Sequence, residues 1–181
     1  MGLEIWAAMI GLAIFAPAVW LYNRLVADRN LVRQGYADID VQLKRRADLV
    51  PQLVEAVRGY AAHEKALLTS VAQLRSAALA AGRPDERFSH ERQLGERLQN
   101  LVLLQESYPQ LKADANFRDL STKLVEVEDA LQYARRFYNG AVKQYRNRLE
   151  SFPDLLIAKL FGFKEMPFFE TEDRTAVKVQ L

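Results

Sequence analysis

A heptad pattern of apolar residues runs through residues 36–78 and restricts this chain to a fold of long helices with coiled-coil-like packing. One set of positions seven apart holds Tyr36, Leu43, Val50, Val57, Glu64, Val71 and Ala78, and the set three residues on holds Ile39, Arg46, Leu53, Tyr60, Leu67 and Leu74. Only Arg46 and Glu64 interrupt this apolar seam. Because residues 23–81 contain two glycines and one proline, the pattern predicts one long amphipathic helix over that range.

The proline, Pro51, has no amide hydrogen, and its ring crowds the carbonyl of Ala47. Since the heptad phase continues on both sides of it, we expect a helix kink at Pro51. A full break into two helices at this residue is the alternative.

Two further helices follow, over residues 86–106 and 117–152. The segment "AAGRPDE" (80–86) combines Gly, Pro and Asp and separates the first two helices, and Pro153 ends the last. Asn116 is the expected N-cap of the last helix. The chain therefore reads as an all-α antiparallel bundle over residues 24–163, followed by an aromatic-rich extended tail over 164–181 whose end, "VKVQL", alternates like an edge strand.

The segment 5–22, "IWAAMIGLAIFAPAVWLY", contains no charged residue and has the length of a transmembrane helix. It predicts a membrane anchor over residues 1–23, with the lipid bilayer as partner of residues 5–22. A cleaved signal peptide is the alternative, but "MGLE" before the run has no Lys or Arg. Arg24, Arg29 and Arg33 follow the run, so the positive-inside rule places the remaining chain in the cytoplasm.

The amino-acid composition and motifs argue against several classes of partner and active site. The 181 residues include no cysteine, and the formal net charge of +2 gives no strong electrostatic reason to expect nucleic acid as a partner. The sequence "HEKAL" at His63 resembles the start of a zinc-protease helix, but Leu67 stands where the second histidine would be. We expect no catalytic residue, no metal and no cofactor.

Five polar residues on otherwise apolar helix faces are candidate site residues: Arg46, Glu64, Glu128, Arg135 and Asn139. Buried charges cost several kcal/mol unless they are paired, so we expect these side chains to pair across helices, with Glu64 or Glu128 holding Arg46. The favoured interpretation is a structural network that sets helix register. A polar groove for a small ligand or peptide is the alternative, and catalysis is the least favoured.

Three separated motifs resemble the LemA family of bacterial membrane proteins: "DVQLKRRADLVPQLVEAVRGYAAHE" (40–64), "YARRFYNGAV" (133–142) and "FPDLLIAKLFGF" (152–163). The resemblance covers nearly the whole chain; one departure is "YRN" at 145–147, where Tyr-Asn in direct succession is expected. It implies a four-helix bundle on one N-terminal helix that spans the bacterial inner membrane once. It implies no particular reaction, and magnetosome members of the family point to the shaping or organising of membrane.

These observations favour a membrane-anchored, non-enzymatic helical scaffold or interaction protein, with a protein partner or a second copy of itself. An accessory or regulatory subunit of a membrane enzyme such as a protease is the alternative. A hydrolase of unrecognised type would need a nucleophile with a base in reach, and the sequence offers none.

Overall fold

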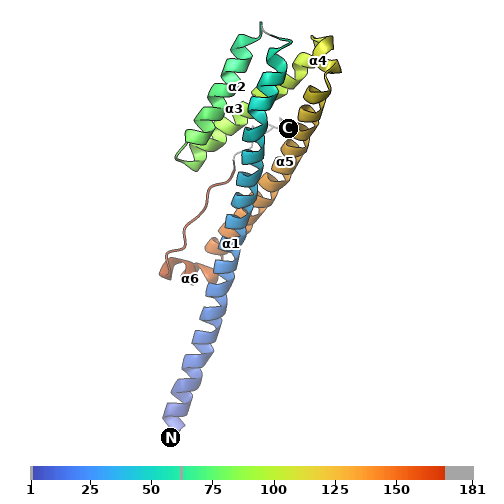
Figure 1. The fold of residues 1–181 in the computed structure, drawn as a ribbon. Coiled ribbons are helices and arrows are strands. Elements are labelled where there is room, and N and C mark those ends of the chain that lie inside the picture. Colours follow the sequence, from blue (N-terminus) through green and yellow to red (C-terminus); the bar gives the residue numbers. More distant parts are fainter. Residues whose placement is uncertain (1, 62, 170–181) are drawn as a thin grey trace, which may run out of the picture. The chain divides into compact units, whose positions relative to one another are not determined.

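A computed structural model describes residues 2–61 and 63–169 of this chain, without the side chains of residues 3–5, 7, 8, 10, 14, 84 and 85. Its elements are α1 (Gly2–Arg58), α2 (Lys65–Ala80), α3 (Pro84–Leu103), the short 3-10 helix η1 (Leu104–Glu106), α4 (Pro109–Ala113), α5 (Ala115–Glu150) and α6 (Asp154–Leu160) (Figure 1). No strand occurs in these ranges, which confirms the all-α prediction. The alternating segment 177–181 lies outside the described residues.

The chain forms two compact units whose boundaries fall inside helices. The first unit combines the chain up to Asp38 with Ala134–Phe169, and the second is Ile39–Tyr133. Both α1 and α5 therefore contribute to each unit. The predicted boundaries at residues 23 and 163 remain predictions.

The second unit is built around one apolar core. α2 and α3 lie side by side as a hairpin (Figure 1). Their apolar faces meet those of α1, α4 and α5 in a cluster whose buried members are Val50, Leu53, Val54, Val57, Ala61, Leu68, Val71, Leu94, Leu98, Leu101, Leu111, Phe117, Leu120 and Leu124. The heptad-seam residues Val50, Leu53 and Val57 thus lie on the side of α1 that faces this core.

The prediction of one helix over residues 23–81 is wrong, because α1 ends at Arg58 and α2 begins at Lys65. The amides of Tyr60 and Ala61 both donate to the carbonyl of Val57, at 3.0 and 2.9 Å, and the chain turns there. Gly59 is a poor helix former, which weakens the helix at this point. The turn lets the two halves of the seam bury in one core, whereas a continuous helix would need separate cover for each half.

Pro51 lies inside α1, so a full break at this residue is excluded. The missing amide frees the carbonyl of Ala47, which would otherwise accept the helical hydrogen bond. Nε of Arg75, on α2, donates to that carbonyl at 2.7 Å. A side chain from the neighbouring helix thus replaces the backbone donor that proline removes.

The last long helix, α5, is capped two residues earlier than expected. Oδ1 of Asp114 accepts from the Phe117 amide at 2.7 Å, so Asp114 and not Asn116 caps the first turn. Hydrogen bonds from this amide and from the Tyr60 hydroxyl (2.9 Å to Oδ2) lower the pKa of Asp114.

The first unit packs the first part of α1 against the last part of α5 and α6. Gly35 permits close contact, because a Cβ there would lie 3.0 Å from the Tyr138 Cα. Tyr22 meets Phe161 and Phe163 edge to face, with ring centroids 4.8 and 5.6 Å apart. These aromatic contacts attach the segment after α6 to α1.

The start of α1 carries exposed large apolar side chains, among them Trp6, Met9, Leu12, Phe15 and Trp20. Within the part of the chain that the structure describes, no helix combines the length and apolarity needed to cross a membrane. The anchor over residues 5–22 therefore stays a prediction.

Candidate functional site

Arg46 is the centre of a buried charged cluster in the second unit. Its Nη2 pairs with the Glu91 carboxylate and also donates to the Glu91 carbonyl at 2.7 Å, while Nη1 pairs with Glu128 Oε1 at 2.9 Å. Arg46 and Glu91 are 1% and 2% exposed, and Glu128 is 32% exposed. Three helices, α1, α3 and α5, are therefore tied together by one guanidinium group.

The two carboxylates keep the cluster charged despite its burial. Burial alone disfavours the charged guanidinium, but the charges of Glu128 and Glu91 outweigh this effect and raise the pKa of Arg46. One donor, Nε, has no hydrogen-bond partner among the described residues. Breaking such a pair would leave an uncompensated buried charge, and the role of the cluster in setting helix register stays a prediction.

Space for the guanidinium comes from Gly95 on α3. A Cβ built at Gly95 would lie 3.2 Å from Nη1 of Arg46, closer than an ordinary contact. Glycine in the middle of a helix lowers stability by about 1 kcal/mol relative to alanine. The presence of glycine at position 95 is thus explained by the Arg46 side chain that it faces.

Of the two carboxylates expected to hold Arg46, the structure places Glu128 there and not Glu64. Glu64 lies in the turn before α2 and accepts a hydrogen bond from the Tyr108 hydroxyl at 3.3 Å. The end of α1 at Arg58 moves Glu64 off the seam that its heptad position suggested.

The sequence analysis did not identify Glu91 as a partner of Arg46, although its position on α3 indicates that it is buried. It lies three residues after Phe88 and three before Leu94, on the buried side of the helix. A carboxylate on an apolar face needs a partner, and Gly95 one turn further on indicates where a large side chain enters.

Arg135 and Asn139 belong to the first unit, where they hold residue Phe169. Asn139 donates from Nδ2 to the Phe169 carbonyl at 3.0 Å and accepts from its amide at 2.8 Å. The Arg135 guanidinium lies 4.5 Å from the centre of the Phe169 ring. Tyr138 adds a bond from its hydroxyl to the Pro167 carbonyl at 2.7 Å, so α5 fixes the tail segment 164–169 through its backbone.

A second buried ion pair, which the sequence analysis did not predict, lies in the first unit. Asp28 on α1 pairs through Oδ2 with Arg148 Nε at 2.6 Å and accepts from Gln144 Nε2 at 2.9 Å. Both partners are on α5, so this pair links α1 to α5 within the first unit.

The Arg46 cluster is closed to solvent on the sides formed by Arg46 and Glu91, and each carboxylate already meets a cation. In the described ranges, no group of three His, Asp or Glu side chains is arranged to hold a metal ion. The absence of metal, cofactor and catalysis remains a prediction from the sequence.

Comparison with known proteins finds one matching family and three similar proteins. The pattern of the LemA family matches residues 35–181. The chain is similar to magnetosome proteins MamQ 2 and MamQ 1 of Paramagnetospirillum magneticum, each 23% identical over 87% of this chain and 68% of the relative. It is also 21% identical to magnetosome protein MamQ of Magnetospirillum gryphiswaldense, over 87% of this chain and 67% of that protein.

Proposed function

This chain belongs to the LemA family, and we propose that it is a membrane-anchored helical scaffold or interaction protein that catalyses no reaction. In this proposal residues 5–22 cross the bacterial inner membrane once. The rest of the chain lies in the cytoplasm and contacts a protein partner or a second copy of itself.

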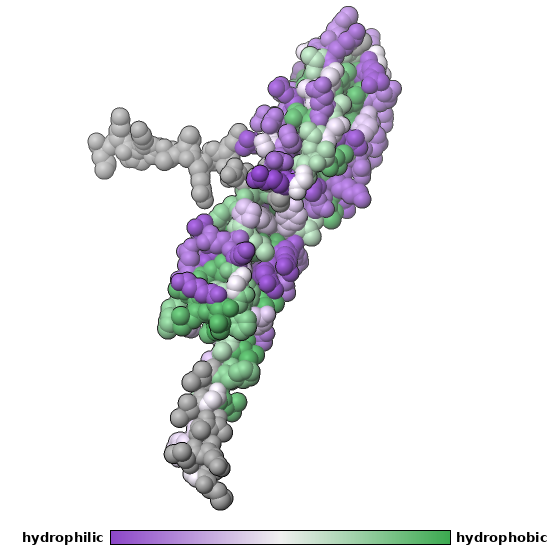
Figure 2. Space-filling model, turned by 90° about the vertical axis from the view of Figure 1, so that its left-hand side faces the viewer, coloured by the Kyte–Doolittle hydropathy of each residue, from purple (hydrophilic) through white to green (hydrophobic). Residues whose placement is uncertain are grey.

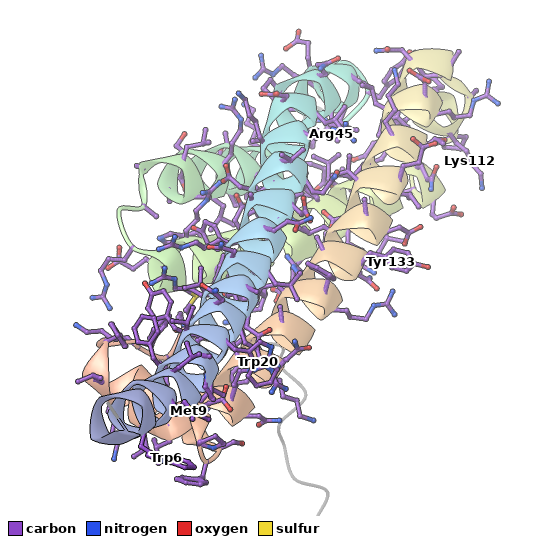
Figure 3. The ribbon with its side chains drawn as sticks, turned by 90° about the horizontal axis from the view of Figure 1, so that it is seen from below. Trp6, Met9, Trp20, Arg45, Lys112 and Tyr133 are labelled. Atoms are coloured by element: carbon purple, nitrogen blue, oxygen red, sulfur yellow. The ribbon has the colours of Figure 1, made fainter. Side chains whose placement is uncertain are left out.

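The observation that carries the anchor is the exposure of large apolar side chains on the first turns of α1. Trp6, Leu12, Phe15 and Trp20 are each more than half exposed. Figure 3 shows Trp6, Met9 and Trp20 projecting from the ribbon of α1. Because burying one such side chain is worth about 1.5–3 kcal/mol, a lipid environment that covers them all is strongly favoured over water.

The orientation rests on the cations that follow the apolar run. Arg24, Arg29 and Arg33 lie within the first three turns after Tyr22. The Arg24 guanidinium lies 5.1 Å from the centre of the Trp20 ring, an arrangement suited to the boundary between lipid and water.

The absence of catalysis is supported by how the charged cluster is built. Arg46 and Glu91 are buried and paired with each other, so they offer no open position for a substrate. Such a cluster can fix helix register, as a scaffold requires.

Two experiments test the proposal. Alkaline carbonate should leave the full chain in bacterial membranes, and protease added outside spheroplasts should leave the cytoplasmic part intact. Release by carbonate, or digestion from outside, would refute the anchor or its orientation, respectively. Purification in mild detergent with the anchor present tests the role: a stoichiometric enzyme partner would replace the scaffold by the accessory-subunit alternative.

A further inference from the structure

A polar pocket of about 420 Å³ opens in the first unit. Arg24 of α1 and Lys143 and Arg148 of α5 line it, together with Asn147, Ser151 and Asp154. Three cations from two helices, with the Asn147 amide beside them, form a donor set suited to a phosphate group. The Ser151 hydroxyl already donates to the Asn147 carbonyl at 2.6 Å.

Two of the residues that line this pocket each carry a buried polar atom without a partner among the described residues. Nη1 of Arg148 is a donor without an acceptor, although Nε of the same residue pairs with Asp28. Oδ1 of Asp154 is an acceptor without a donor, and Asp154 is only 5% exposed. A buried polar group without a partner is unfavourable, so a ligand that satisfies both groups is favoured.

The ligand must therefore present an acceptor and a donor together. A phosphate diester supplies anionic oxygens for Arg148, Arg24 and Lys143, and a primary ammonium on the same headgroup supplies N–H donors for Asp154. We propose that this pocket binds the headgroup of a phospholipid that carries a primary ammonium, with the phosphate against the three cations and the ammonium against Asp154.

The position of the pocket along the chain favours a lipid over a free phosphate ester. Arg24 comes two residues after Tyr22, the end of the charge-free run, so this step rests on the proposed anchor. Leu156, Leu160 and Phe161, in and after α6, are all more than half exposed. Figure 2 shows the hydrophobic surface that gathers over α6, where acyl chains would find apolar contact.

The test is a titration of the full chain, solubilised in a maltoside detergent, with short-chain lipids. Dihexanoyl phosphatidylethanolamine should bind about tenfold more tightly than dihexanoyl phosphatidylglycerol, which lacks the ammonium. Asp154→Asn should abolish this preference, and Lys143→Gln should weaken the binding of both lipids about tenfold. Lys123→Gln and Asp129→Asn, at exposed positions on α5 in the other unit, should change neither affinity.

Equal affinity for the two lipids, or an Lys143→Gln variant that binds like the parent, would overturn the proposal. Lys143 is exposed, so its variant should fold even if Asp154→Asn does not. Glycerophosphoethanolamine, which has the same headgroup without acyl chains, distinguishes a lipid ligand from a soluble one. If it binds as tightly as the lipid, the pocket binds a soluble phosphate ester and the proposal of a lipid ligand is refuted. Headgroup selectivity in detergent combined with release by carbonate would instead refute the anchor alone.

Discussion

The hydrogen bond between Arg75 and the Ala47 carbonyl should be worth more in the presence of Pro51 than in its absence. We consider three variants of the full chain: Arg75→Met, Pro51→Ala and the combination of both. In the parent protein Nε of Arg75 donates to this carbonyl at 2.7 Å, and Pro51 has no amide hydrogen to offer. In Pro51→Ala the new backbone amide can take the same acceptor.

The expected magnitudes follow from this difference. Ala47 is buried, so Arg75→Met alone leaves a buried carbonyl without a donor and should lower the free energy of unfolding by about 1–3 kcal/mol. In the Pro51→Ala background the same change should cost about 0.5 kcal/mol, the low end for a dispensable hydrogen bond. The coupling energy is therefore expected near 1–2 kcal/mol, or roughly 4 °C in melting temperature for a chain of this size.

Thermal unfolding followed by far-ultraviolet circular dichroism, in one detergent throughout, measures the four members of the cycle. Pro51→Ala alone should raise the melting temperature, because proline inside a helix costs about 3 kcal/mol and Arg75 repairs only part of this. Arg97→Met, an exposed arginine on α3, is the control and should melt like the parent. Additive effects of Arg75→Met and Pro51→Ala would show that the carbonyl does not depend on Arg75, and would refute the reasoning.

Three further predictions concern the charged cluster, the cap of α5 and the tail segment. Arg46→Met should lower stability by about 3–5 kcal/mol, and adding Glu91→Met should restore most of it; a single variant that melts like the parent would contradict the structural role. Because the pKa of Asp114 is lowered in the folded state, its contribution to stability is present above about pH 3.9, the ordinary Asp value, and is lost as the pH falls through the folded-state pKa. The melting difference between the parent and Asp114→Asn should accordingly shrink in acid, and a constant difference would exclude this linkage. Asn139→Ala removes both bonds to the Phe169 backbone, so trypsin should cut faster after the exposed Lys164, while the melting of the remaining chain changes little. Unchanged cleavage would show that the segment is held by other contacts.

Heptad spacing was sufficient to predict that residues 36–58 are helical and which side of this helix is largely buried, because it depends on local geometry alone. Leu43, Val50, Leu53 and Val57 are all buried as the seam requires. The end of α1 at Arg58 could not be read in the same way. In the sequence, the heptad phase continues past Arg58 without interruption. The turn is determined by the tertiary fold, which buries both halves of the seam in one core.

The partners of Arg46 show the same limit. The sequence indicated that a cation on an apolar face needs a carboxylate, and Glu128 was one of two candidates. Glu91 could not be chosen, since its choice depends on α3 packing against α1. Likewise, the hydrogen bond from Arg75 to the Ala47 carbonyl could not be predicted from the local sequence, because it depends on how α2 packs against α1.

The contact between Gly95 and Arg46 has a consequence for how this sequence can change over time. Alanine at position 95 would displace the guanidinium by a few tenths of an ångström, because its Cβ would lie 3.2 Å from Nη1 of Arg46. Once Arg46 is replaced by a smaller side chain, alanine at position 95 becomes accessible and improves the helix. Alanine at position 95 is therefore accommodated more easily after the arginine has been lost than before. Relatives that keep arginine at the position of Arg46 should retain glycine at the position of Gly95, and those that have lost the arginine should vary there.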